Sequence, residues 1–221
     1  MSDYPTASTS ALIDVLQHRA SSPFALSLGL GFAGASAFLF SNVDTLLWSP
    51  TALVGSAKER KKVGLEGNQG TAVELWAWYM SKAVPSTGIS LAVGALGLTS
   101  AGFLIPVSSF STYGRDLRRI LFGSVLLLTS TVPYSFFSIT PLNKTLLSLT
   151  EKAKAKRANP LYPDSKPASS ELYTQDSRGL LPQEESQARM LLEKWIKAHT
   201  GRVVLAAAGW TVALGGLLLA Y

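Results

Sequence analysis

Three side chains near the C-terminal end of the chain have types and spacing that suit chemistry. Trp195, His199 and Arg202 lie at positions i, i+4 and i+7, so an unbroken helix presents them on one face. An aromatic ring, a titratable imidazole and a fixed positive charge then meet where the chain enters an apolar stretch. This arrangement predicts a site for a hydrophobic planar molecule. Trp and Arg at the entry of a membrane helix also serve as interfacial anchors, and the sequence leaves that alternative open.

A fourth candidate, Asn143, ends a different apolar stretch, two positions after Pro141. An Asn at the end of a helix can simply bind free backbone groups. The functional interpretation is an amide that holds a substrate oxygen near His199. The sequence leaves both interpretations open.

The residues that usually hold cofactors are scarce. The chain has no Cys, and its two histidines, His18 and His199, lie far apart in sequence, which argues against thiolate and histidine metal sites. The string from Gly29 to Gly34 matches G-x-G-x-x-G, but no strand and turn precede it, so the dinucleotide fingerprint lacks its context. We therefore predict no cofactor and no metal. Small residues at this spacing instead let membrane helices approach closely.

The elements that must position these residues are apolar. Four stretches without charged residues dominate the chain, at positions 20–43, 83–114, 120–143 and 203–221. A helix needs roughly 20 apolar residues to cross a bilayer, and backbone groups inside the hydrocarbon must pair within the segment. We predict an all-α fold: one membrane domain over residues 1–221, with a bundle of four transmembrane helices at about 24–46, 85–105, 120–142 and 203–221.

Two features interrupt this pattern. Pro133 lies inside the third predicted helix and should kink it, because proline removes a backbone donor. A polar, flexible loop is predicted at about 150–183, where prolines are frequent and apolar residues are few. After Pro182, acidic residues and then a helical apolar pattern predict a short amphipathic helix before the last transmembrane helix. Its apolar face comprises Ala188, Leu191, Leu192, Trp195, Ile196 and His199.

The formal charge of +6 is unevenly placed. Sixteen of the 20 Lys and Arg residues lie in two segments, 49–82 and 144–202. This asymmetry orients membrane helices and argues against a nucleic-acid partner. We predict that both long loops are cytosolic and both termini lumenal, in the endoplasmic reticulum or another endomembrane. The oligomeric state is left open.

The candidate residues also resemble a known family. The pattern P-x-N before the polar loop and W-x-x-x-H-x-x-R at the entry of the last helix is similar to that of small four-helix membrane proteins that include fungal anthrone oxygenases. Pro141, Asn143, Trp195, His199 and Arg202 carry this resemblance.

The resemblance implies a cofactor-free oxygenase that uses dioxygen to convert an aromatic polyketide anthrone into an anthraquinone in fungal secondary metabolism. His199 would be the base, Arg202 and Asn143 would hold the oxyanion, and Trp195 would stack on the fused rings. The partners would be this hydrophobic substrate, dioxygen and the lipid bilayer. A non-catalytic membrane scaffold or small-molecule carrier is the alternative. Asp44 lies near the end of the first predicted membrane helix, and no charged residue lies in the interior of any of the four, which disfavours ion-coupled transport.

Overall fold

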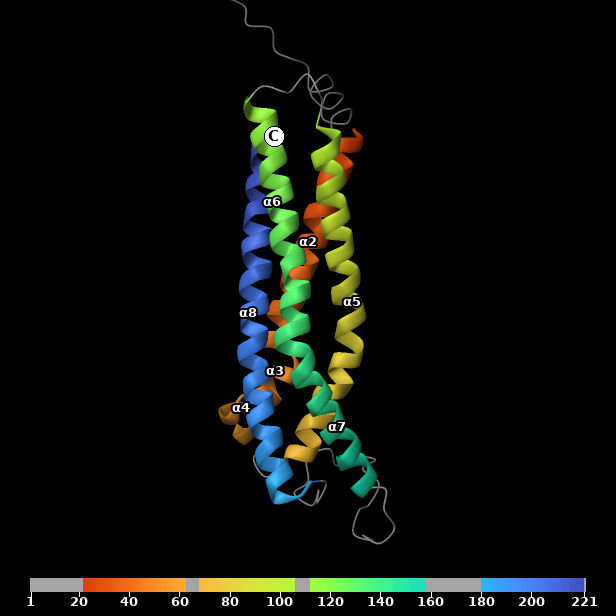
Figure 1. The fold of residues 1–221 in the computed structure, drawn as a ribbon, viewed down its shortest axis with the longest axis vertical. Helices are drawn as coiled ribbons and strands as arrows, with labels where there is room; N and C mark the ends of the chain where they lie inside the picture. The colour runs from red at the N-terminus through yellow and green to blue at the C-terminus, as the bar shows by residue number, and fades with distance from the viewer. Residues whose placement is uncertain (1–21, 63–67, 106–111, 158–179, 221) are drawn as a thin grey trace, which may run out of the picture.

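The computed structural model describes residues 22–62, 68–105, 112–157 and 180–220, which contain helices and no strand. Figure 1 shows the long helices running side by side along the long axis of the molecule. The elements are α2 (Pro23–Leu47), α3 (Pro50–Gly55), α4 (Ala57–Lys62), α5 (Gln69–Leu104), α6 (Thr112–Tyr134), the π turn η2 (Ser135–Ile139), α7 (Thr140–Arg157) and α8 (Pro182–Ala220). The predicted all-α fold is confirmed.

Four helical segments of this part of the chain are long and apolar enough to cross a membrane. They are Pro23–Leu47, Gln69–Leu104, Gly114–Lys156 and Pro182–Ala220. The protein is therefore an integral membrane protein with a bundle of four candidate spans. At about 1.5 Å per residue, the 39-residue α8 is about 58 Å long, whereas the hydrocarbon layer is about 30 Å thick. Part of α8 must therefore extend beyond the membrane.

Several helix ends differ from those predicted. α5 begins at Gln69 rather than at about 85, since the Asn68 side chain accepts a hydrogen bond from Thr71 N at 3.0 Å and caps the helix. α6 begins at Thr112 rather than at about 120. The amphipathic segment before the last span is not a separate helix but the first part of the unbroken α8.

The predicted polar loop starts later than expected. α7 continues to Arg157 and so covers positions 150–157 of that loop. The physical reason is an apolar face, because Leu146, Leu149 and Ala153 are buried at helical spacing. At its other end, Pro182 and Gln183 already belong to α8. Positions 158–179 of the predicted loop lie outside the described residues.

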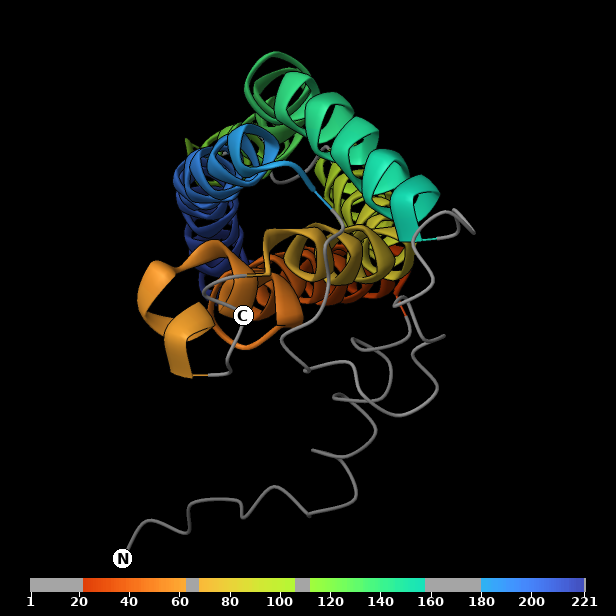
Figure 2. The same ribbon diagram turned by 90° about the horizontal axis from the view of Figure 1, so that it is seen from below.

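The four spans surround a common axis when viewed end-on (Figure 2), with α2 packed most extensively on α5 and α6 on α8. The contact between α2 and α5 is made by glycines. Gly31 faces Gly97 and Gly34 faces Gly94, and a Cβ atom on Gly94 would lie 2.8 Å from the backbone nitrogen of Ala35. The interpretation of the glycine string as a close helix contact is confirmed.

The path of the third span is irregular after Pro133. The Thr140 backbone N–H bonds to Ser135 O, five residues back, and the intervening residues form the π turn η2. The chain changes direction at this level as α6 passes into α7 (Figure 1). Proline removes one helical hydrogen bond, and π turns within helices are frequent at functional sites.

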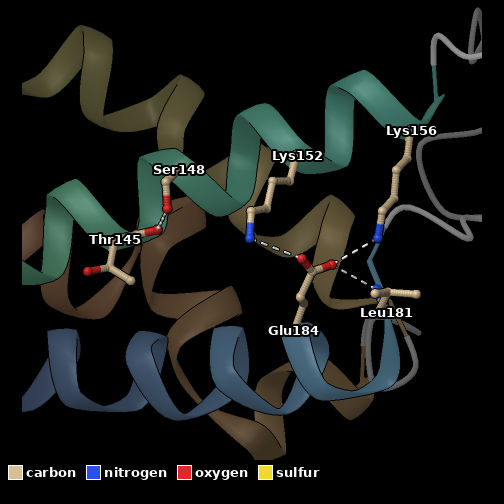
Figure 3. A network of polar contacts seen from close by, with 6 residues as sticks. All are labelled: Thr145, Ser148, Lys152, Lys156, Leu181 and Glu184. Carbon is tan, nitrogen blue, oxygen red and sulfur yellow. Dashed lines mark hydrogen bonds and ion pairs between the residues drawn. The ribbon is translucent and has the colours of Figure 1, made fainter.

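A carboxylate fixes the start of α8 against the end of α7 (Figure 3). Glu184 accepts from Leu181 N at 3.0 Å, from Lys156 Nζ at 2.9 Å and from Lys152 Nζ at 3.2 Å. Glu184 lies in the part of α8 that precedes its apolar stretch. The Leu181 amide, followed by the lysines, lowers the pKa of Glu184 from 4.5 to about 2. The predicted acidic first turn after Pro182 is therefore present, and it connects the two helices.

Candidate functional site

The unbroken α8 places the predicted residues on one side of the helix. The rings of Trp195 and His199 stack with their centroids 4.9 Å apart and an interplanar angle of 10°. Arg202 follows one turn later, and its guanidinium lies 5.5 Å from the centroid of the Phe38 ring on α2. The sequence-based prediction that these three side chains share a face therefore agrees with the structure.

His199 is 2% exposed and contacts α2 through one ring nitrogen. Its Nε2 lies 3.2 Å from the backbone oxygen of Asn42. Because a carbonyl oxygen can only accept, Nε2 carries the hydrogen, and in the neutral imidazole the lone pair is on Nδ1. Nδ1 has no hydrogen-bond partner among the described residues. The α2 backbone thus leaves His199 with a free basic nitrogen.

Trp195 is fully buried and engaged on several sides. One face stacks on His199, and its edge meets Trp76 on α5 at a centroid distance of 6.0 Å and an angle of 82°. Its Nε1 donates to Asn143 Oδ1 at 2.9 Å. The structure therefore brings Asn143 to Trp195 rather than to His199, and Trp195 in turn stacks on the imidazole.

A cavity of about 330 Å³ lies beside His199 and Arg202, between α2, α5, the α6–η2 segment and α8. Its apolar lining comes from Met80, Ala83, Val84, Gly88, Leu91, Val132 and Phe136, and its polar lining from Asn42, Thr45, Thr87, Thr131, Ser135, Thr140, His199 and Arg202. Trp195 and Asn143 do not belong to either set. A wall that combines apolar side chains with converging polar groups is typical of small-molecule sites.

Asn42 is the residue that sequence reasoning missed. It is 1% exposed, its Nδ2 donates to Phe38 O at 2.7 Å, and its Oδ1 has no partner among the described residues. Burial of a polar atom without a partner is costly, so an amide inside an otherwise apolar span was the available signal. Arg202 Nε and His199 Nδ1 also lack partners among the described residues, so three residues that line the cavity each hold one buried polar atom without a hydrogen bond.

The threonine hydroxyl groups that line the cavity donate hydrogen bonds to backbone oxygens of their own helices. Thr45 donates to Ser41 O at 2.8 Å, Thr87 to Ala83 O at 2.7 Å, and Thr131 to Leu128 O at 2.6 Å. Such bonds within a helix leave the oxygen lone pairs as acceptors. The wall is therefore rich in acceptors, with the Arg202 guanidinium as its cation.

Tyr134, just before the π turn, holds the third span against α8. Its hydroxyl donates to Ala198 O at 2.9 Å, next to His199. This contact needs the glycine at position 201, because a Cβ atom there would lie 2.7 Å from Tyr134 Cζ. Gly201 thus lets the π-turn side of the cavity approach the helix that carries the imidazole.

No group of three or more His, Cys, Asp or Glu residues suited to a metal ion occurs within the ranges that the structure covers. The polar groups of the site are one imidazole, one guanidinium, amides and hydroxyls. This set can move a proton and hold a negative oxygen. The predicted independence from cofactors and metals remains a prediction.

The comparisons with known proteins agree with the motif. A family model described as anthrone oxygenase matches residues 77–212. This range includes Asn143, Trp195, His199 and Arg202, while Asn42 lies before it. A search of the curated proteins and a search of the solved structures found no match. The resemblance drawn from the sequence is thereby confirmed at the level of the family.

Proposed function

The chain belongs to the anthrone oxygenase family, and we propose that it oxidises the methylene carbon of a polyketide anthrone to the carbonyl of an anthraquinone with dioxygen. The observation that carries the proposal is the unpaired Nδ1 of the buried His199 beside a cavity between membrane helices. A hydrophobic aromatic substrate from fungal secondary metabolism suits this position, because it dissolves in the bilayer.

The overall reaction balances without a further reductant. The anthrone loses both methylene hydrogens and gains one oxygen atom, while the second oxygen atom of dioxygen leaves as water with those two hydrogens. A base first removes one methylene proton. The resulting carbanion passes one electron to dioxygen, and the carbon radical and superoxide combine to a peroxide. Protonation of the peroxide, loss of the second methylene proton and cleavage of the O–O bond give the carbonyl and water.

His199 is the base in this scheme. Its Nδ1 takes the first methylene proton and returns it to the peroxide oxygen. The backbone carbonyl of Asn42 accepts from Nε2 and so holds the ring in the tautomer that this step requires. A positioned base of this kind typically contributes about 10² to 10⁴ in rate.

Arg202 stabilises the oxyanion that forms when the anthrone is deprotonated. Its guanidinium is a fixed cation on the cavity wall, and donors act strongly in a site without water. Asn42 Oδ1 accepts a hydrogen bond from a hydroxyl group of the substrate. Trp195 and Asn143 position the imidazole. In this proposal Trp195 does not stack on the substrate and Asn143 does not bind the oxyanion, the roles that the family resemblance implied for them.

The central experiment adds an anthrone under air to membranes that contain the protein and follows quinone formation against empty membranes, because anthrones oxidise spontaneously. We expect His199→Ala to lower the rate above this blank by at least about 100-fold, in line with the contribution of a general base. His18→Ala is the control because His18 is the second of two imidazoles in the chain. A wild-type rate for His199→Ala would favour the scaffold or carrier alternative.

The proposed orientation puts residues 58–62 and 152–157 in the cytosol and the termini in the lumen, on the basis of the uneven basic charge. Protease added to sealed endoplasmic-reticulum microsomes should cut the chain between α7 and α8 and leave an N-terminal tag intact. Digestion of the tag with protection of the segment between α7 and α8 would reverse the orientation.

A further inference from the structure

The rim of the cavity lies between α5 and the α6–η2 segment and is apolar. Val84 on α5 is 55% exposed, and Val132 and Phe136 on the opposite side are 55% and 64% exposed, although all three line the cavity. The polar residues Asn42 and His199 of the same cavity are buried. The cavity therefore has a polar interior and an apolar rim that faces away from the bundle.

Contacts on both sides of this rim hold α5 against the chain segment opposite. Toward one end of the bundle, Arg118 Nε on α6 donates to Gly102 O at 3.0 Å. Toward the other end, Thr150 on α7 donates to Val73 O at 3.3 Å. Between these contacts the opposite segment contains Pro133 and the π turn, which redirect it. We call the rim formed by Val84, Gly88, Val132 and Phe136 the lateral window.

A packed core closes the cavity toward the end of the bundle that carries α7. Trp195 covers one face of His199, and Trp76 covers the edge of Trp195. Leu146 and Leu192, both fully buried, belong to the same hydrophobic cluster. A molecule that entered from this end would have to displace well-packed aromatic and aliphatic side chains, which cores resist.

The lateral window lies at the margin of the hydrocarbon layer. Lys82 is exposed and is the last charged residue of α5. Val84 and Gly88 follow it by two and six positions, or about 3 and 9 Å along the helix axis. The window therefore faces the acyl chains close to the membrane surface.

We propose that the site fills sideways through the lateral window with a flat, oxygen-bearing aromatic molecule dissolved in the bilayer, and that Val84, Gly88 and Phe136 determine which molecules pass. The inference rests on the proposed function and adds to it the route and the selectivity. A lipid acyl chain suits the apolar rim but offers no polar group to the interior, which Asn42, His199 and Arg202 line. A flat aromatic molecule with oxygen substituents satisfies both the rim and the interior.

Gly88 permits a block that is added after folding. A Cβ atom there meets nothing within 4 Å, and the chain has no Cys. Gly88→Cys in liposomes is treated with benzyl methanethiosulfonate, which attaches a benzyl group through a disulfide that dithiothreitol removes. Gly29→Cys is the matched control, because Gly29 is also exposed and its Cβ also meets nothing within 4 Å. Binding of 9,10-anthraquinone, as an unreactive probe, and oxidation of anthrone are both measured.

We expect complete labelling of Gly88→Cys to lower probe binding and anthrone oxidation more than tenfold, and dithiothreitol to restore both. The Gly29→Cys control should change less than twofold. Gly88→Phe provides the same block without a labelling step. Unchanged probe binding in the fully labelled protein overturns the lateral window. Probe binding that the block abolishes, in a protein that does not oxidise anthrone, supports the window and contradicts the proposed function.

A nitroxide attached to Val84→Cys tests which phase the rim faces. Its electron spin resonance should relax faster with dioxygen, which concentrates in lipid, than with a water-soluble nickel chelate. Faster relaxation with the chelate places the rim in water and overturns the proposal.

Discussion

Both sides of α5 carry glycine, yet they pack in opposite ways. On the side facing α2, Gly94 and Gly97 meet Gly34 and Gly31, so the two backbones touch. On the side facing η2, Gly88 meets no atom within 4 Å of an added Cβ, and the space beside it is the cavity. A glycine opposite a glycine brings helices together, whereas a glycine beside a π turn leaves room for a ligand.

The largest effect should come from disrupting the glycine contact between α5 and α2. Gly94→Leu places a branched side chain against the backbone of Gly34 and Ala35, and overpacking costs about 1 to 3 kcal/mol, or more where a rigid backbone cannot move away. We expect little folded protein and a markedly lower Tm, measured by thermal unfolding in detergent.

Gly29→Leu is the control for that substitution, since an added Cβ at Gly29 meets nothing within 4 Å. Its Tm should stay close to that of the native chain. Equal Tm values for the two variants would mean that the glycine contact does not stabilise the bundle.

A smaller effect is expected from a substitution in the cavity, on the side of α5 that faces η2. Asn42→Leu removes an unpaired buried oxygen but keeps the backbone carbonyl that binds His199. Stability should be unchanged or higher, because removal of an unsatisfied buried polar group is neutral or favourable. For an anthrone with ring hydroxyls, kcat/KM should fall roughly threefold to tenfold, the value of one hydrogen bond.

Unsubstituted anthrone is the control substrate for Asn42→Leu, because it offers no hydroxyl to Oδ1. Its kcat/KM should not change. An equal loss with both substrates would mean that Asn42 acts on the imidazole or on packing, and would contradict its assignment as a substrate-binding residue.

The difference between the two sides also marks how much the sequence could predict. The spans follow from apolar length, the α2 contact from glycine spacing, and the shared face of Trp195 and His199 from helical periodicity. All three are properties of one segment at a time. The end of α7 was predictable by the same reasoning, because Leu146, Leu149 and Ala153 repeat at helical spacing, but the prolines and the few apolar residues over 150–183 suggested a loop.

The pairing between helices was not accessible in this way. His199 and Asn42 lie 157 positions apart, and their contact depends on how far α8 is displaced along α2. The bond from Trp195 to Asn143 likewise depends on the register of α7 against α8. Periodicity within a helix carries no information about such registers, so the sequence could place Trp195, His199 and Arg202 on one face but could not pair Asn143 with Trp195 or Asn42 with His199.

The smallest effect should come from replacing Glu184, which joins the end of α7 to the start of α8. Its pKa is lowered from 4.5 to about 2, so the ionised carboxylate stabilises the folded chain above pH 4.5, and this contribution is lost as the pH falls toward 2. The Glu184 side chain is 16% exposed, and ion pairs near a surface contribute less than about 1 kcal/mol. Glu184→Gln should therefore lower the Tm slightly at pH 7, and by a smaller amount at pH 3.

Glu185→Gln is the matched control for this pH dependence, and the expected sign is opposite. Burial raises the pKa of Glu185, so its ionised form disfavours folding at neutral pH, and removing the charge should leave the Tm at pH 7 unchanged or slightly higher. If Glu184→Gln lowered the Tm equally at pH 7 and pH 3, the capping hydrogen bond to Leu181 would act without the charge. The α7–α8 connection would then be insensitive to pH.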